Sequence, residues 1–358
     1  MEDNKDRIAM LDLLVQPAFC VNHGIISKVN DAARRRMIEP GTPINDILAT
    51  GTREYAEFED GCLYLSITAA GSTSGASVTR MEEGDIFVLD HADDQSELQA
   101  MALAAQQLRQ PLANVMSVAD NLFPVSGTDD DPHLLDQVAR INRGLYQLQR
   151  IICNMSDAYR YCQEQSPRME IRNVCSLLEE LFSGLAPLVK QADIDLRFSL
   201  PNEDIFCLVD EEKLERAVNN MISNAMKFAS RDSVIYAQLT RRENMLYLTV
   251  QDCGNGIPQS LKSNLHSRYL REPGIEDSRH GIGLGMVIIQ SAAAAHQGTV
   301  LIQHPKDAGT RITMTMPIHQ SSEGIVQSAV LRVDYAGEQD HRLLELSDTL
   351  PSSAYRKK

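Results

Sequence analysis

The sequence has no long hydrophobic run. No stretch approaches the roughly 20 consecutive apolar residues that a helix needs to cross a bilayer. The first residues, MEDNKDRIAM, also lack the basic start and apolar middle of a secretory signal. We therefore expect a cytoplasmic protein without membrane insertion.

A dense stripe of Lys and Arg is also missing, and the formal net charge is −15. Nucleic acids and anionic membranes are polyanions, so they would be repelled by such a chain. We expect a protein partner and no nucleic acid. The length of 358 residues predicts two or three domains, and an apolar content of 43% is enough for packed cores.

Close cysteine pairs are absent as well. The seven cysteines are scattered, and no two have the spacing of a metal-binding or redox-active pair. We expect buried or idle thiols.

Residues 1–95 alternate short apolar runs with turns. Leu63, Leu65 and Ile67 follow the period of two that is typical of strands, and glycines interrupt such runs. The order of the runs predicts an antiparallel sheet with helices inserted after its second strand.

Two apolar seams follow between residues 97 and 163. In each seam the apolar residues advance by alternating steps of three and four, which is the heptad pattern of helices in a coiled-coil bundle. The first seam runs from Leu98 to Leu122 and the second from Val138 to Cys162, with the turn-forming segment FPVSGTDDDP between them. We expect a helical hairpin that completes a four-helix bundle with a second copy.

Residues 168–318 alternate helical and strand patterns, which predicts an α/β sandwich. Three stretches stand out in this part: NNMISNAMKFAS at 219–230, QDCGNGIP at 251–258 and HGIGLGMVI at 280–288. In this order they resemble the nucleotide-binding boxes of the histidine-kinase branch of the Bergerat-type ATPases. Residues 103–116, LAAQQLRQPLANVM, resemble the phosphoacceptor box of the same kinases.

The resemblance implies a multidomain α+β architecture of the two-component sensor histidine kinases. It predicts a PAS-like sensor domain at 1–95, because the VNDAA segment is similar to the passage from strand to helix in PAS domains. A dimerisation and phosphoacceptor-like hairpin follows at 96–165, forming a dimeric four-helix bundle, and an ATP-binding domain at 166–318. A C-terminal extension at 319–358 reads as a pair of strands around the AGEQD turn.

The resemblance also assigns an ATP site with Mg²⁺. Its residues are Asn220, Asn224, Lys227, Phe228, Asp252, Gly254, Gly256, Ile257, Arg268, Tyr269, Gly281, Gly283, Leu284 and Gly285.

By this resemblance Asn224 coordinates Mg²⁺ and Asn220 lies near the phosphates. Lys227 neutralises phosphate charge, and Phe228 lies against the base. Asp252 accepts a hydrogen bond from the exocyclic amine of adenine. All five residues stand in the order that the family requires.

Glycines and a loop complete the implied site. Gly254 and Gly256 let the backbone approach the purine, and the glycines of HGIGLGM open a helix whose backbone donors hold phosphates. The segment LHSRYLREPGIEDSR is similar to the ATP lid of the family, with Arg268 and Tyr269 at matching positions and His266 where phenylalanine is usual.

The phosphoacceptor box lacks its histidine. Gln106 and Gln107 stand where the family has His and Glu, while Arg109 and Pro111 keep the register. An amide nitrogen has no usable lone pair for attack on a phosphate, and an amide cannot act as a carboxylate base. We therefore expect no self-phosphorylation on this hairpin.

Several functions remain open at this stage. The chain can be a kinase-like protein that transfers phosphate to a partner or removes it, and Gln107 or Gln110 then positions water for dephosphorylation. It can instead be a pseudokinase that binds ATP and acts as a dimeric scaffold. A third reading is a kinase for serine or histidine of a partner, as in the related anti-sigma-factor kinases. The implied partners are a second copy through 97–163 and a response regulator or another kinase.

Overall fold

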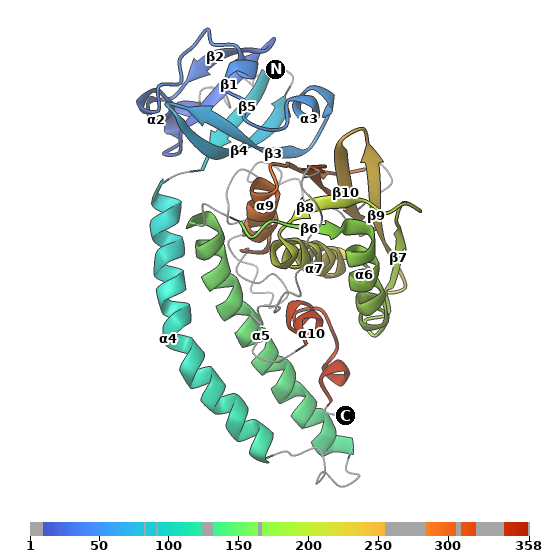
Figure 1. Cartoon of the computed structure of the whole chain (residues 1–358). Helices are drawn as coiled ribbons and strands as arrows, with labels where there is room; N and C mark the ends of the chain where they lie inside the picture. The colour runs from blue at the N-terminus through green and yellow to red at the C-terminus, as the bar shows by residue number, and fades with distance from the viewer. Residues whose placement is uncertain are drawn as a thin grey trace.

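The structure, a computed structural model, describes residues 10–81, 84–90, 92–122, 132–163, 167–254, 284–305, 309–319 and 340–356. Figure 1 shows a sheet domain at one end, two long helices beside it and a second α/β part against the second long helix. None of the helices in these ranges is both long and apolar enough to span a membrane.

The N-terminal part is an antiparallel sheet in the order β2-β1-β5-β4-β3. Its elements are η1 (Met10–Leu13), β1 (Ala18–Asn22), β2 (Ile25–Val29), α2 (Asp31–Arg35), η2 (Ile44–Asp46), α3 (Thr52–Glu57), β3 (Cys62–Ala69), β4 (Ser72–Met81) and β5 (Gly84–Leu89). The short helices follow the second strand, as expected. Phe19 and Phe87 stack at 4.8 Å between ring centroids in the core of this sheet.

Two long helices come next, α4 (Ala92–Leu122) and α5 (Pro132–Gln163). They pack against each other along their lengths (Figure 1). Helix α4 continues through Pro111. Leu98 and Ala105 of its seam are buried, whereas Leu108 and Val115 are exposed. Each chain therefore covers only part of its own seam.

The second α/β part contains most of the remaining elements. They are β6 (Glu170–Asn173), α6 (Val174–Lys190), β7 (Asp195–Ser199), β8 (Phe206–Val209), α7 (Glu211–Phe228), β9 (Val234–Arg242), β10 (Met245–Gln251), α9 (Leu284–Ala295), β11 (Val300–Gln303) and β12 (Arg311–Pro317). Strands β7, β9, β10, β11 and β12 belong to the large sheet, while β6 and β8 form a small separate sheet. Apolar residues of α6, α7 and α9 pack on the large sheet as one core.

The two sheets are continuous. Strand β3 pairs with β11 in antiparallel register, with Leu63 opposite Leu301, so the order becomes β2-β1-β5-β4-β3-β11-β12-β10-β9-β7. Gly61 makes this approach possible: its φ is +94°, and a Cβ there would lie 2.0 Å from the carbonyl oxygen of Ile302. The sequence patterns indicate separate domains for these two parts, and the joined sheet was not expected from them.

The C-terminal extension differs from the expected pair of strands. Its second apolar stretch folds as helix α10 (His341–Glu345) and, further on, the 3-10 helix η4 (Ser352–Tyr355). Asp340 caps α10 by accepting a hydrogen bond from the Arg342 backbone N–H at 2.9 Å. This cap favours the start of a helix here, and Leu344, Leu346 and Leu350 of the segment are buried. The first apolar stretch lies outside the described residues.

Candidate functional site

Helix α7 positions the two asparagines of the predicted site. Asp210 precedes the helix and accepts a hydrogen bond from the Lys213 backbone N–H at 3.1 Å, which fixes its start. Asn220 and Asn224 follow one turn apart on one face. Asn220 is 0% exposed, and its Nδ2 donates to the carbonyl oxygen of Arg216 at 2.8 Å.

The first turn of α9 faces these amides. A Cβ on Gly285 would lie 2.8 Å from Asn220 Oδ1 and 3.8 Å from Asn224 Oδ1. Within the described part of the chain, Asn220 Oδ1 is buried without a hydrogen-bond partner. Magnesium takes oxygen ligands, including amide oxygens, and a helix N-terminus attracts phosphate. The residues present therefore fit a magnesium ion that is bound together with phosphate.

Asp252 follows β10 and is 2% exposed. Its Oδ1 accepts from the Gly254 backbone N–H at 2.8 Å, and its Oδ2 accepts from the Thr310 backbone N–H at 3.2 Å. Burial raises the pKa of this carboxyl above its ordinary value of 3.8, while the two backbone donors act in the opposite direction. Each carboxylate oxygen has a further lone pair for another donor.

The loop after β10 touches the end of α7. A Cβ on Gly254 would lie 1.9 Å from the carbonyl oxygen of Phe228. Only glycine permits this approach, so Asp252 and the last turn of α7 lie side by side. The structure thus brings together Asn220, Asn224, Phe228, Asp252, Gly254 and Gly285 from three separate stretches of chain, with Leu284 buried beside Gly285.

Lys227 is on the last turn of α7, but its ammonium already has a partner. Its Nζ lies 3.2 Å from Asp348 Oδ2, and the side chain is 11% exposed. Burial and the nearby Arg150 guanidinium lower the pKa of Lys227 below its ordinary value of 10.5, whereas Asp348 raises it. No sequence pattern predicts this ion pair, because Lys227 and Asp348 are far apart in the chain.

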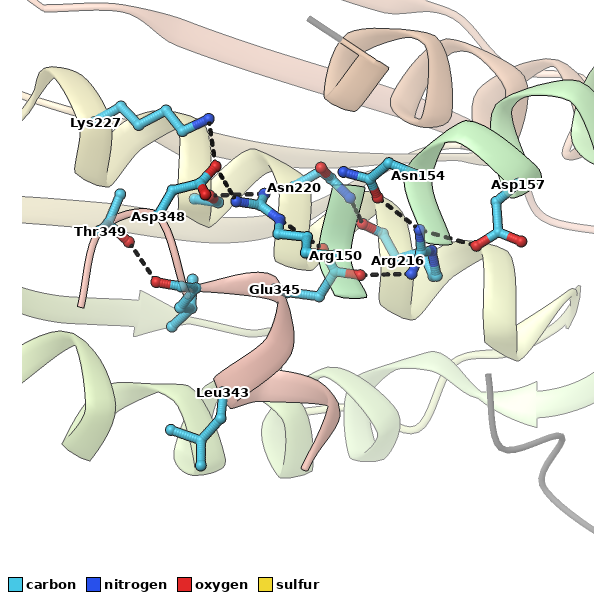
Figure 2. A network of polar contacts seen from close by, with 12 residues as sticks. Arg150, Asn154, Asp157, Arg216, Asn220, Lys227, Leu343, Glu345, Asp348 and Thr349 are labelled. Atoms are coloured by element: carbon cyan, nitrogen blue, oxygen red, sulfur yellow. Dashed lines mark hydrogen bonds and ion pairs between the residues drawn. The ribbon is translucent and has the colours of Figure 1, made fainter. Parts of the chain in front are cut away.

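A network of buried charged side chains lies around Lys227 (Figure 2), and the sequence patterns did not predict it. Arg150 of α5 contacts Asp348 at 2.6 Å and Glu345 at 3.4 Å. Arg216 of α7 contacts Glu345 at 2.6 Å and Asp157 of α5 at 3.0 Å. Arg150 also donates to Ser223 Oγ at 3.0 Å. A charged residue in a helix is usually exposed to solvent, and the partners here are far apart in the sequence. No local sequence pattern therefore predicts these pairs.

The glutamines of the acceptor box lie on exposed positions of α4. Gln106 and Gln107 both face solvent in the single chain, directly after the buried Ala105. Gln110 donates through Nε2 to Asn114 Oδ1 at 3.2 Å. The predicted site residues Gly256, Ile257, Arg268, Tyr269, Gly281 and Gly283 lie outside the described residues.

Residues 209–320 match the family described as "Histidine kinase-, DNA gyrase B-, and HSP90-like ATPase". This segment contains α7, β10 and α9, the elements that hold the asparagines, Asp252 and Gly285.

Curated relatives match a longer part of the chain. It is 27% identical over 233 residues to the hybrid signal transduction histidine kinase D of Dictyostelium discoideum, covering 63% of this chain and 15% of that protein. It is 26% identical over 227 residues to the sensor histidine kinase RppB of Synechocystis, covering 63% and 50%. It is 25% identical over 245 residues to the sensor histidine kinase WalK of Bacillus subtilis, covering 64% and 38%. The chain therefore spans half or less of the length of these relatives.

One solved structure has a comparable fold over much of the chain. The crystal structure of full-length ShkA in complex with AMPPNP gives a TM-score of 0.51 at 17% sequence identity, covering 62% of this chain and 46% of that one. At this identity the likeness concerns the fold. The matching ATPase segment and the sensor histidine kinase relatives support the two-component histidine kinase family for this chain.

Proposed function

We propose that this protein is a cytoplasmic, sensor histidine kinase-like signalling protein that binds Mg-ATP without carrying its own phosphoacceptor histidine. It transmits a signal by phosphotransfer to a partner or by dephosphorylation of that partner. The partner is a response regulator or another kinase.

The observation that carries this proposal is that α7 contacts both other parts of the site: its Asn220 and Asn224 face Gly285 in the first turn of α9, and its last turn lies against the loop that carries Asp252. Asn224 would hold Mg²⁺ through its amide oxygen, with Asn220 beside the phosphates. Asp252 would accept a hydrogen bond from the adenine amine. Bound Mg²⁺ would neutralise phosphate charge, while the residues of α7 and α9 orient the nucleotide.

The exposed glutamines support the absence of self-phosphorylation. Gln106 offers no nucleophilic nitrogen, and Gln107 offers no proton-accepting carboxylate. Gln107 and Gln110 are in contrast suited to hold a water molecule against a phosphorylated partner. The hairpin therefore has the side-chain amides that the proposed dephosphorylation requires.

The N-terminal sheet supports a sensor role. Its antiparallel sheet, with short helices after β2, agrees with the antiparallel sheet and inserted helices that the PAS resemblance implies. The apolar side chains of its core do not indicate which ligand it would sense.

The alternative is an ATP-binding pseudokinase that acts as a dimeric scaffold. The Lys227–Asp348 ion pair favours it, because the lysine that the family resemblance assigns to the phosphates is already paired within the chain. Incubation of the full chain with radiolabelled ATP, with and without candidate partners, separates the two. Label on a partner supports transfer, whereas bound but unhydrolysed ATP supports the scaffold.

Asp252→Asn tests the nucleotide site directly. The variant should bind Mg-ATP about 1 to 3 kcal/mol more weakly, because an amide in place of the carboxylate mispairs a buried hydrogen bond. Calorimetry on the full chain measures this, with Asp195→Asn as a matched control at an exposed ion pair. Absence of heat with the native chain, or equal affinity in the variant, would contradict the site.

A further inference from the structure

The C-terminal segment, residues 340–356, is firmly seated between α5 and α7 (Figure 1). Leu344, Leu346 and Leu350 are fully buried. The Tyr146 and Tyr355 rings meet edge to face at 5.1 Å between centroids. The segment is thus a folded part of the molecule.

Polar contacts fix the segment to α5 in one register. Arg143 donates to the carbonyl oxygens of Ser347 and Asp348 at 3.2 and 3.0 Å. Asn142 Nδ2 donates to the carbonyl oxygen of Tyr355 at 3.1 Å. These bonds set the backbone that carries Glu345 and Asp348, and so aim both carboxylates at the cations.

The surface under the segment is cationic. Arg150, Arg216 and Lys227 meet there, and Asp157 of α5 contacts Arg216 from the side opposite the segment's own carboxylates. Glu345 and Asp348 provide the other negative charges, and Glu345 is 0% exposed. Buried cations that lose their partners are strongly destabilising, so these cations require an anion at all times.

Asp348 and a nucleotide phosphate are two anions for the same cation. Asp348 Oδ2 bonds both Lys227, at 3.2 Å, and Arg150, at 2.6 Å (Figure 2). Lys227 lies one turn beyond Asn224, on the helix whose amides face Gly285. An oxygen of a triphosphate at the N-terminus of α9 would find its nearest α7 cation already paired.

We propose that Asp348 is an intramolecular competitor for nucleotide phosphate. The C-terminal segment holds its carboxylate on Lys227 as a phosphate mimic, and bound ATP must displace that carboxylate. The inference rests on the proposed nucleotide site. It also predicts that ATP loosens the segment on α5, because Arg150 shares Asp348 with Lys227.

The Asp348→Asn variant tests whether the Asp348 carboxylate competes with the phosphates of ATP and not with its adenosine part. The variant should bind Mg-ATP about five- to tenfold more tightly, while its affinity for adenosine stays unchanged because adenosine has no phosphate. Arg150 keeps Glu345 and Ser223 as partners in this variant. Asp195→Asn is the matched control, since it removes the same charge at an exposed pair with Lys190.

The outcomes are distinct. Unchanged or weaker Mg-ATP affinity in Asp348→Asn, with a native chain that binds Mg-ATP, would overturn the inference alone. If neither the native chain nor the Asp348→Asn variant binds Mg-ATP or adenosine, the proposed site is overturned and the competition with it. An equal gain in the Asp195→Asn control would reduce the effect to net charge and also overturn the inference.

Hydrogen exchange on the native chain gives a second measurement that needs no variant. Backbone amides of residues 346–350 are held by local bonds such as Leu350 N–H to the Leu346 carbonyl oxygen at 2.9 Å. They should exchange faster with saturating Mg-ATP than with adenosine. Equal exchange under both conditions would overturn the competition.

Discussion

At the scale of single residues, Gln106 and Gln107 define what this chain lacks. Both side chains are exposed on a continuous helix, and Arg109 and Pro111 keep the order of the box. The described helix around them runs without interruption from Ala92 to Leu122. We therefore expect the proposed loss of acceptor chemistry to depend on these two side chains.

Restoring both residues should restore the reaction. The native chain should carry no acid-labile phosphate on its hairpin, whereas Gln106→His with Gln107→Glu should gain base-stable, acid-labile phosphate on residue 106. Phosphate-tag electrophoresis at neutral pH and mass mapping measure this. Gln110→His, one turn further along the exposed helix, is the matched control. Acid-labile phosphate on the native hairpin would refute the expectation, and an unlabelled double variant would favour the pseudokinase.

His296 makes stability depend on pH. Its Nε2 accepts a hydrogen bond from the Asp210 backbone N–H at 3.0 Å, which requires an unprotonated Nε2. Burial lowers the pKa of His296 below its ordinary value of 6.5. The unfolded chain therefore takes up the proton first as pH falls, and acid favours unfolding.

We expect the free energy of unfolding to be highest above the unfolded pKa of 6.5 and to fall below it. The loss from His296 should reach about 1 kcal/mol per pH unit in this range. Denaturant titrations between about pH 7.5 and 5.5 measure it, and His296→Gln should have a shallower slope. Parallel slopes in the two proteins would assign the dependence to other groups.

At the scale of elements, the two heptad seams are only half covered in one chain. Leu108 is 49% exposed and Val115 is 55% exposed on α4, and Ile141 and Leu148 are exposed on α5. The exposed seam residues recur every seven positions, as Leu108, Val115 and Leu122 do on α4, and therefore lie along one side of the helix. A second copy of the hairpin is suited to cover the exposed set, as the proposed homodimer requires.

Leu108→Glu should convert a dimer into a monomer, because it places a charge in the seam between copies. Light scattering of the native chain should give twice the chain mass. Leu103→Glu is the control, since Leu103 is exposed on the same helix outside the seam. A native chain that stays monomeric at micromolar concentration would contradict the dimer.

Sequence patterns predicted the elements whose signals are local. Helix α7 has apolar periodicity and a capping Asp210, and strands such as β10 alternate buried and half-buried residues. The short strands β6 and β8 were missed because four residues carry little pattern. Asn220, Asn224, Asp252 and Gly285 were found through motifs, while Asp348 was not, because its partner Lys227 is distant in sequence.

At the scale of the whole molecule, the joined sheet is the feature that no local pattern predicts. The pairing of β3 with β11 links residues more than two hundred positions apart. Arg53 and Glu243 form an exposed ion pair at 3.0 Å across the same junction. Strands of the N-terminal part and strands of the ATPase-like part are therefore expected to unfold together.

Gly61→Ala should weaken this junction by about 1 to 3 kcal/mol, because a Cβ at Gly61 would lie 2.0 Å from the Ile302 carbonyl oxygen. Gly24→Ala is the matched control: its φ of +76° carries similar backbone strain, but no atom lies within 4 Å of the new Cβ. Chemical denaturation measures both. Equal losses would mean that the close approach to β11 contributes nothing.

The shared sheet also limits how this protein can be divided or recombined. Without residues 62–69, strand β11 would keep β12 on one side and present Val300 and Ile302 on an unpaired edge on the other. Bare edges with apolar residues invite pairing with other chains. The N-terminal part thus also acts as an edge cover, and it is not an interchangeable module: a chimera that replaces it must bring its own strand to pair with β11.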